Sequence, residues 1–253
     1  MTSRTILLTG ATGKFGKVLS RHFVAAGDTV IGTARSAESL ESLGKTLGDS
    51  DKRFIGIVSD LAAEGGVERL VAELASRTLY PDCLINNARS LDYLKAQDSG
   101  IVSRENFANE YVLDVVVPYE LTMILAKHSN SRLAKVVNIG SQYGSVAANP
   151  SLYDDPERQS PIHYSVAKAA LVHLTRELAV RLAKRQVQIN CVAFGGVEGR
   201  VDEAFRQRYS TLCPMGRMLK EDELAGPVEL LLSVHCHGIT GHTLMADGGW
   251  SLW

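Results

Sequence analysis

The chain contains 253 residues, of which 45% are apolar and 22% are charged, and its 27 Lys and Arg against 28 Asp and Glu leave a formal net charge of −1. These ordinary globular values argue against disorder, and the near-zero charge offers no electrostatic footprint for nucleic acid or an anionic membrane. The apolar runs are far shorter than the roughly 18–20 residues that span a bilayer, and residues 1–13 lack the long apolar stretch of a signal peptide. We therefore expect a cytoplasmic protein in which residues 1–253 form a single domain.

The cysteines indicate neither a metal site nor a disulfide framework. They are scattered along the chain without a C-x-x-C pair, at Cys83, Cys191, Cys213 and Cys236. We expect reduced, partly buried thiols and no bound metal.

Short apolar runs alternate with helix-like stretches from the start of the chain. Because the runs are apolar almost throughout, we expect strands buried on both faces, as in a parallel sheet. The strands are predicted at Thr5–Thr9, Thr29–Thr33, Phe54–Val58, Cys83–Asn86, Lys135–Ile139, Gln188–Ala193 and Thr243–Ala246. The helices are predicted at Phe15–Ala26, Ala37–Leu47, Val67–Thr78, Asn106–Ser129, Ser165–Arg185 and Glu221–Ser233. This alternation predicts an α/β fold with a single Rossmann-type, doubly wound parallel sheet and helices on both faces.

A glycine-rich turn, TGATGKFG at Thr9–Gly16, directly follows the first strand and leads into a predicted helix. Glycines in such a turn let the backbone approach a pyrophosphate at the helix N-terminus. A P-loop is excluded, because no Gly-Lys-Ser/Thr follows at its spacing. A turn without a ligand is the alternative to a cofactor site. We assign the cofactor contacts of this turn to Gly10, Thr12, Gly13, Lys14, Phe15 and Gly16.

The end of the second strand indicates which dinucleotide fits. NAD-dependent enzymes of this architecture usually place an acid there to hold the ribose 2′-hydroxyl, but Thr33–Ser36 offers none. Arg35 supplies a fork of donors suited to a 2′-phosphate, with the Ser36 hydroxyl beside it, and Lys14 would add a second positive charge. We predict that NADP(H) is preferred over NAD(H), the alternative being that Arg35 and Lys14 face solvent.

Tyr164 and Lys168 are four residues apart in a predicted helix, which places them on one face. A lysine ammonium so close stabilises the phenolate, which makes Tyr164 a usable acid/base near neutral pH. Ser141, just after the fifth strand, lies where a hydroxyl can hydrogen-bond a substrate oxygen. A Y-x-x-x-K pair alone is a weak signal, but it becomes specific together with the glycine turn, Asn86–Ala88 and Ser141.

These motifs resemble the short-chain dehydrogenase/reductase family over essentially the whole chain, in the compact-length branch of that family. The resemblance implies that Tyr164 is the acid/base, that Lys168 holds the cofactor ribose and activates Tyr164, and that Ser141 orients the carbonyl or alcohol. The matching segments are TGATGKFG, Asp60–Leu61, NNA at Asn86–Ala88, NIGS at Asn138–Ser141, YSVAK at Tyr164–Lys168, FGGV at Phe194–Val197 and ADGG at Ala246–Gly249.

The resemblance also implies further cofactor contacts and an oligomer. Asp60 and Leu61 would contact adenine, Asn87 and Ala88 would line the ribose side, and Val197 would hold the nicotinamide carboxamide. Gly195 is a further cofactor contact. A homodimer or homotetramer is implied, formed through the helices predicted at Asn106–Ser129 and Ser165–Arg185.

The sequence departs from the family pattern at several positions. The glycine spacing in Gly10–Gly16 is that of the extended, sugar-nucleotide branch of the family, and Arg89 and Phe194 stand where Gly and Pro are usual. Asp114 stands where the family often carries an Asn that anchors a proton-relay water. Because carboxylate oxygens can also hold a water, we keep Asp114 in the catalytic set.

The leading hypothesis is an NADP(H)-dependent oxidoreductase that transfers a hydride between nicotinamide and a carbonyl or secondary alcohol. One alternative is a catalytically idle dinucleotide-binding scaffold, against which the Ser/Tyr/Lys set argues. Another is an epimerase or dehydratase with bound NAD, which the glycine spacing suggests and Arg35 disfavours.

The expected substrate contacts are Arg89, Gln142 and Tyr143. Arg89 puts a permanent positive charge near the substrate mouth, and a long charged loop at Ala148–His163 lies nearby, so we predict a polar, anionic, sugar-type substrate. The segment Ser141–Gly144 with this loop also resembles reductases of bacterial surface-polysaccharide and flagellin-glycan biosynthesis. Reduction of a 3-ketoacyl or steroid-type ketone is the alternative.

Overall fold

The structure of the chain is a computed structural model that describes residues 3–48, 52–199 and 201–253. The strands are β1 (Thr5–Leu8), β2 (Thr29–Ala34), β3 (Phe54–Val58), β4 (Cys83–Asn86), β5 (Lys135–Ser141), β6 (Gln188–Phe194) and β7 (Thr243–Ala246). They form one seven-stranded sheet in the order β3-β2-β1-β4-β5-β6-β7, in which every neighbouring pair is parallel. Because the strand order reverses between β1 and β4, the sheet is doubly wound, and the predicted fold class is confirmed.

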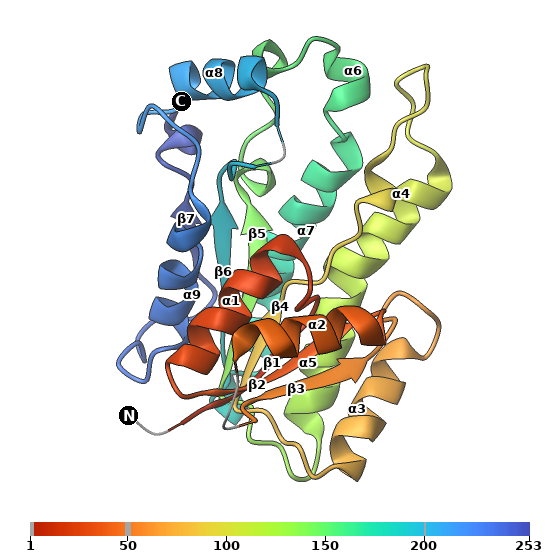
Figure 1. Cartoon of the computed structure of the whole chain (residues 1–253), viewed down its shortest axis with the longest axis vertical. Helices are drawn as coiled ribbons and strands as arrows, with labels where there is room; N and C mark the ends of the chain where they lie inside the picture. The colour runs from red at the N-terminus through yellow and green to blue at the C-terminus, as the bar shows by residue number, and fades with distance from the viewer. Residues whose placement is uncertain (1–2, 49–51, 200) are drawn as a thin grey trace.

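Helices cover both faces of this sheet (Figure 1). On one face Phe23 and Leu231 of the covering helices pack against the strands, and on the other face Leu70 and Leu121 do so. None of the described helices is long and apolar enough to cross a membrane. The α-helices are α1 (Lys14–Ala25), α2 (Ala37–Leu47), α3 (Gly66–Ser76), α4 (Arg104–Tyr111), α5 (Val117–Lys127), α6 (Pro156–Gln159), α7 (Ile162–Arg181), α8 (Glu203–Leu212) and α9 (Ala225–Leu232).

The helix predicted at Asn106–Ser129 is interrupted. Helix α4 ends at Tyr111, a π-helical turn spans Val112–Val116, and α5 begins at Val117. Pro118 lies in the first turn of α5 and has no N–H to donate, and its ring clashes with the preceding turn of a regular α-helix. The wider π turn relieves this conflict immediately before the proline. The predicted helical stretch is therefore present, but the π turn within it was not predicted.

Two segments near the C-terminal half of the sheet differ from the prediction. Helix α8 was missed, because its sequence is polar; its one local signal is Asp202, whose side chain accepts a hydrogen bond of 2.7 Å from the Phe205 N–H as the N-cap. The loop predicted at Ala148–His163 contains the short helix α6, and α7 begins inside it at Ile162. Both segments border the carboxyl edge of the sheet.

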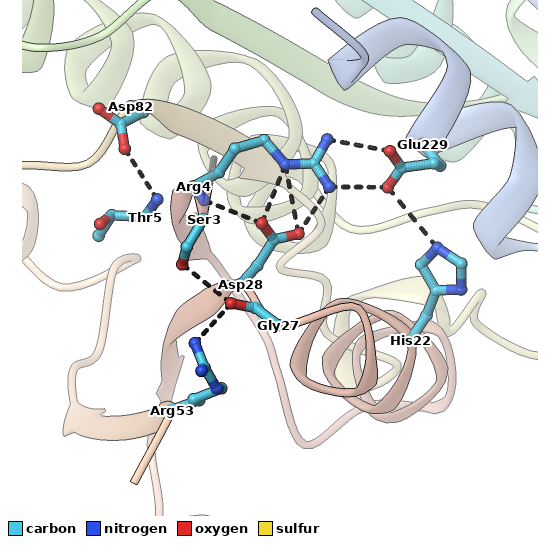
Figure 2. A network of polar contacts seen from close by, with 9 residues as sticks. All are labelled: Ser3, Arg4, Thr5, His22, Gly27, Asp28, Arg53, Asp82 and Glu229. Atoms are coloured by element: carbon cyan, nitrogen blue, oxygen red, sulfur yellow. Dashed lines mark hydrogen bonds and ion pairs between the residues drawn. The ribbon is translucent and has the colours of Figure 1, made fainter. Parts of the chain in front are cut away.

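The amino edge of the sheet is fastened by a network around Arg4 (Figure 2). The Arg4 guanidinium forms an ion pair of 2.6 Å with Asp28, which precedes β2, and one of 2.9 Å with Glu229 on α9. The Arg4 N–H also donates to Asp28 over 2.9 Å, and His22 of α1 lies 3.6 Å from Glu229. The Asp28 side chain is only 5% exposed, so its charge depends on Arg4.

We expect Arg4→Ala to lower the free energy of unfolding by about 3–5 kcal/mol, because it leaves the buried Asp28 carboxylate without its cation. The control is Arg77→Ala, which removes an exposed ion pair with Glu73 and should cost no more than about 1 kcal/mol. Urea unfolding at neutral pH measures both values. Equal, small losses in the two variants would contradict a fastening role for Arg4.

Candidate active site

A cavity of about 760 Å³ opens at the carboxyl edge of the sheet, near the point where the strand order reverses. Open α/β sheets bind their ligands at this edge. Among the residues assigned from the sequence, Gly16, Ser36 and Asp114 are not part of the cavity wall. The others line it: Gly10, Thr12, Gly13, Lys14, Phe15, Arg35, Asp60, Leu61, Asn87, Ala88, Arg89, Ser141, Gln142, Tyr143, Tyr164, Lys168, Gly195 and Val197.

The three glycines of the first turn have different environments. Gly10 has φ +65°, and a Cβ there would lie 2.8 Å from the Cα of Ala88. A Cβ on Gly16 would collide with the carbonyl oxygen of Gly10. Gly13 lines the cavity and caps α1 without a side-chain hydrogen bond, so no side chain competes for the first N–H groups of the helix. This helix N-terminus fits the pyrophosphate of a dinucleotide.

The glycine turn is held in place by Thr9 and Asn87. Thr9 directly follows β1 and Asn87 directly follows the neighbouring strand β4. The Thr9 hydroxyl accepts hydrogen bonds of 2.9 Å from the N–H groups of both Asn87 and Ala88. The Asn87 amide donates to the carbonyl oxygens of Thr9 and Gly10 over 2.8 and 3.1 Å. The Asn87 side chain therefore shapes the cofactor turn, and Thr9 is a supporting residue that the motif analysis missed although it stands directly before Gly10.

The residues assigned to the adenosine half of the cofactor differ in whether their side chains already have hydrogen-bond partners in the protein. Arg35 is exposed on the cavity wall at the end of β2, and within the described ranges no hydrogen bond or ion pair involves its guanidinium. The Ser36 hydroxyl instead caps α2 by accepting from the Ser39 N–H over 3.2 Å. Asp60 also accepts a backbone N–H, that of Ala62, over 3.2 Å. Arg35 is thus the available cation at this end of the cavity.

Lys14 reaches toward the loop that follows β6. Its ammonium donates to the carbonyl oxygens of Val197 (3.5 Å) and Glu198, and it lies 3.7 Å from a Glu221 carboxylate oxygen. These bonds tie the glycine turn to the C-terminal part of the chain. The expected contact between Lys14 and a 2′-phosphate stays a prediction.

The Lys168 ammonium is buried and has two anchors. It donates over 3.0 Å to Asp114 Oδ1 in the π-helical turn and over 3.0 Å to the carbonyl oxygen of Ile139 on β5. Burial is the largest single influence and lowers the pKa of Lys168, but the charges of Asp114 and Tyr164 and the hydrogen bond to Asp114 together raise this pKa above its usual value. Lys168 is therefore an ammonium in the resting site, and its nitrogen lies 5.6 Å from the centre of the Tyr164 ring.

A second cation lies against the same tyrosine. The guanidinium carbon of Arg89, at the carboxyl end of β4, is 4.4 Å from the Tyr164 ring centre, which is cation–π distance. The sequence analysis directed Arg89 toward substrate, whereas the structure also places it over the tyrosine. Tyr164 is half-buried on the cavity wall and lies close to the charges of both Arg89 and Lys168.

Ser141 is the last residue of β5 and lies on the cavity wall with Tyr164 and Lys168. Its hydroxyl accepts a 3.2 Å hydrogen bond from the Tyr143 N–H, which leaves the hydroxyl hydrogen free to donate. The structure brings Ser141, Tyr164 and Lys168 to the wall of one cavity, and their catalytic roles stay predictions.

Tyrosines and a glutamine form another part of the cavity wall. The hydroxyls of Tyr143 and Tyr153 are 3.2 Å apart, and burial raises the pKa of Tyr143. The Tyr209 hydroxyl donates to Gln142 Oε1 over 3.1 Å and accepts from the Gly196 N–H over 2.8 Å. Burial also raises the pKa of Tyr209, to about 12. Tyr209 thus clamps the segment after Ser141 to the loop after β6.

Several residues of this part of the wall were not predicted from the sequence. Tyr153 comes from the expected loop and Tyr209 from the unpredicted helix α8, together with Phe205, whose ring lies 5.6 Å from that of Tyr153. Their only sequence signal was that Tyr153 and the segment 205–209 contain aromatic residues. This signal does not show whether the side chains face the cavity. That Tyr153, Phe205 and Tyr209 line the cavity becomes apparent only when the position of α8 in the fold is known.

The fold and cavity define a dinucleotide-binding α/β protein, and comparisons with known proteins specify its family. A family model described as enoyl-(acyl carrier protein) reductase matches residues 10–251. The chain belongs to the short-chain dehydrogenase/reductase family and is an oxidoreductase acting on CH–OH groups or the corresponding carbonyls.

Two curated relatives are similar over almost the whole chain. The chain is 31% identical to the uncharacterized short-chain type dehydrogenase/reductase y4vI of Sinorhizobium fredii, over 98% of this chain but 43% of that protein, so it spans less than half of that relative. It is 27% identical to the 3-oxoacyl-[acyl-carrier-protein] reductase FabG of Aquifex aeolicus, over 98% of each chain.

Solved structures with this fold carry either cofactor. A Pseudomonas aeruginosa RhlG/NADP active-site complex is 25% identical, with a TM-score of 0.84 over 99% of this chain and 97% of that one. A short-chain dehydrogenase from Leptospira borgpetersenii with bound NAD+ is 24% identical, with a TM-score of 0.82 over 99% and 94% of the two chains. The second likeness supports the fold alone.

Proposed function

We propose that this protein is an NADP(H)-dependent oxidoreductase that interconverts a carbonyl and a secondary alcohol on a polar, anionic, sugar-type substrate. The observation that carries the proposal is the position of Tyr164. It lines the cavity with Ser141, and its ring centre is 4.4 Å from the Arg89 guanidinium carbon and 5.6 Å from the Lys168 ammonium. Such an arrangement suits proton exchange between Tyr164 and a substrate oxygen.

The proposed roles follow from the groups present. Ser141 donates its free hydroxyl hydrogen to the substrate oxygen and holds that oxygen in place. Tyr164 gives its proton to this oxygen in reduction and takes it back in oxidation, while Lys168, held by Asp114, stabilises the phenolate. When bound, the nicotinamide cofactor supplies or accepts the hydride. Asp114 acts in this scheme by fixing the charge and position of Lys168.

The proposed cofactor site is the part of the cavity that runs from the glycine turn to β6. The N-terminus of α1 at Gly13 would hold the pyrophosphate, and Arg35 would pair with the 2′-phosphate of NADP. The remaining proposed contacts are the residues assigned from the family motifs: Asp60, Leu61, Asn87, Ala88, Gly195 and Val197.

The proposed substrate preference rests on charge and hydrogen-bonding groups. Arg89 is exposed just after β4, and Tyr143 and Tyr153, whose hydroxyls are 3.2 Å apart, line the same cavity. A carboxylate or phosphate on the substrate would pair with Arg89. The second candidate is reduction of a 3-oxoacyl group, which similarity to a FabG reductase over 98% of both chains favours.

The proposed assembly is a homodimer or homotetramer formed through α4 and α7. Phe107 and Tyr111 on α4 and Ile162 and Val166 on α7 are large apolar or aromatic side chains that are exposed in the single chain. Exposed patches of this kind often mark protein–protein interfaces. The two helices are packed against each other, so the four side chains belong to neighbouring elements.

Tyr164→Phe removes the transferable proton and keeps the ring. We expect kcat for NADPH-dependent carbonyl reduction to fall by about 10²–10⁴-fold, with little change in NADPH affinity. Tyr119→Phe, on the exposed surface of α5, is the control and should retain normal turnover. Near-normal turnover of Tyr164→Phe would contradict the proposed role.

Arg35→Asp tests the cofactor preference. Loss of a charge-assisted bond to the 2′-phosphate should weaken NADP binding by about 1.5–3 kcal/mol and shift preference toward NAD. Fluorescence titration with both cofactors gives the two dissociation constants, and NAD serves as the internal control. An unchanged ratio of the constants would show that Arg35 does not recognise the 2′-phosphate.

Arg89→Ala tests the substrate preference, using matched anionic and neutral carbonyl substrates. Loss of a charged hydrogen bond should reduce kcat/KM for the anionic substrate more than for the neutral one. The difference should correspond to a loss of about 1.5–3 kcal/mol in transition-state stabilisation. Equal losses on both substrates would assign Arg89 to Tyr164 alone, and the anionic preference would then be rejected.

A further inference from the structure

Glu110 is a buried carboxyl group that the proposed chemistry does not yet use. It lies in the last turn of α4, and its side chain is only 1% exposed. Both of its carboxyl oxygens are buried without a hydrogen-bond partner in the part of the chain that the structure describes. An ionised carboxylate in such a position is costly, so a buried Glu is rarely left unpaired. The burial therefore calls for a protonated carboxyl group.

Asp114 is the neighbour that connects Glu110 to the active site. The two residues are four apart, on the segment where α4 passes into the π-helical turn. Asp114 is 2% exposed; its Oδ1 holds Lys168, whereas its Oδ2 is buried without a partner. Two neighbouring buried carboxyls cannot both be charged cheaply, so the pair favours holding one proton.

The charges around Glu110 agree with this assignment. Burial is the main cause that raises its pKa, to about 7; the Asp114 charge raises it further, and Arg89 and Lys168 lower it. His163 of α7 and Asp92 of the 3-10 turn at Asp92–Leu94 are on the other elements packed against α4. His163 bonds through Nε2 to the Tyr93 carbonyl oxygen, and Asp92 lies 3.9 Å from Lys95.

We propose that Glu110 and Asp114 form a buried carboxyl pair that carries one exchangeable proton and returns it to Lys168 after each turnover in the direction of reduction. Glu110 is then a positioning residue of the proton path, acting on Tyr164 through Asp114 and Lys168. This inference rests on the proposed function, because Lys168 needs a returned proton only if Tyr164 gives one to substrate.

The proton balance of the path is closed. The O–H bond of Tyr164 breaks as the substrate O–H bond forms, and the Lys168 ammonium then gives a proton to the phenolate and becomes an amine. Asp114 passes the shared proton to this amine, and Glu110 supplies the proton to Asp114. Glu110 is left as a carboxylate and takes one proton from solvent, which restores the resting state.

The first test reads the proton without substrate or cofactor. An infrared pH titration of the protein should show a protonated carboxyl band that titrates near neutral pH, in the wild type and in Glu105→Gln, an exposed carboxyl on the same helix. The band should be absent in Glu110→Gln, and its midpoint should move to lower pH in Asp114→Asn, because the neighbouring charge is removed. A band that persists in Glu110→Gln, or no such band in the wild type, overturns the carboxyl pair.

Thermal unfolding gives an independent check of the same proton. Because the folded protein holds the Glu110 proton more tightly than the unfolded chain does, ionisation destabilises the fold as the pH rises through about 7. The Tm of Glu110→Gln should therefore increase relative to that of the wild type between about pH 5 and about pH 8. Glu105→Gln should show no such trend, and a flat difference for Glu110→Gln contradicts the pair.

The second test reads the return of the proton. With enzyme preloaded with NADPH, the first turnover of Glu110→Gln at pH 7 should stay within about twofold of the wild type, while later turnovers slow by about tenfold or more. A structural defect would slow both phases equally, and that result overturns the proton path. Wild-type behaviour in both phases rejects the path alone, whereas a wild type that reduces no carbonyl overturns the proposed function and the path with it.

Discussion

The buried ammonium of Lys168 is the interaction on which the arrangement of the active site depends. A buried charge is tolerated only when it is paired and hydrogen-bonded, and Lys168 meets this condition through Asp114 and the Ile139 carbonyl oxygen, each at 3.0 Å. These bonds join three elements, namely α7, β5 and the π-helical turn between α4 and α5. Tyr164 lies one helical turn before Lys168, so the same bonds fix its position beside Ser141 at the end of β5.

The charges around this ammonium set the electrostatics of the active site. Arg89 adds a second cation over Tyr164, and Asp114 and Glu110 add two carboxyl groups behind Lys168. With both carboxyls ionised the four groups would be neutral overall; with one proton on the pair they carry one positive charge. An anionic substrate and an anionic cofactor are both favoured by the protonated state. The resulting electrostatics link the substrate preference to the proposed proton path.

Much of the fold could be predicted from the sequence, because its signals are local. Apolar runs and a glycine turn specify buried parallel strands and a βα turn, and the spacing of Tyr164 and Lys168 places both on one helix face. The π-helical turn was missed although Pro118 is a local signal, because helix periodicity continues through it. Helix α8 was missed because its polar sequence gives little apolar pattern, despite the cap at Asp202.

Most of the residues that line the candidate site could be predicted from the sequence, but the contacts among them could not. Contacts such as Lys14 with Val197, or Arg89 with Tyr164, join residues far apart in the sequence, and neither spacing nor composition specifies them. The burial of Glu110 is of the same kind, since a single Glu on a polar helix is expected to face solvent. Tertiary packing decides all three, and these are the contacts from which the proposals about substrate and proton transfer arise.

The central claim is that this cavity transfers a hydride to a carbonyl carbon while Tyr164 protonates the oxygen. The most direct measurement uses NADPH that carries deuterium at the transferable nicotinamide position, with an anionic keto-sugar as substrate, and mass spectrometry of the product. The account predicts one deuterium on the carbinol carbon of the product in the wild type, and none formed by Tyr164→Phe on the same time scale. Oxidation of NADPH without deuterium on that carbon, or equal transfer by both proteins, would contradict it.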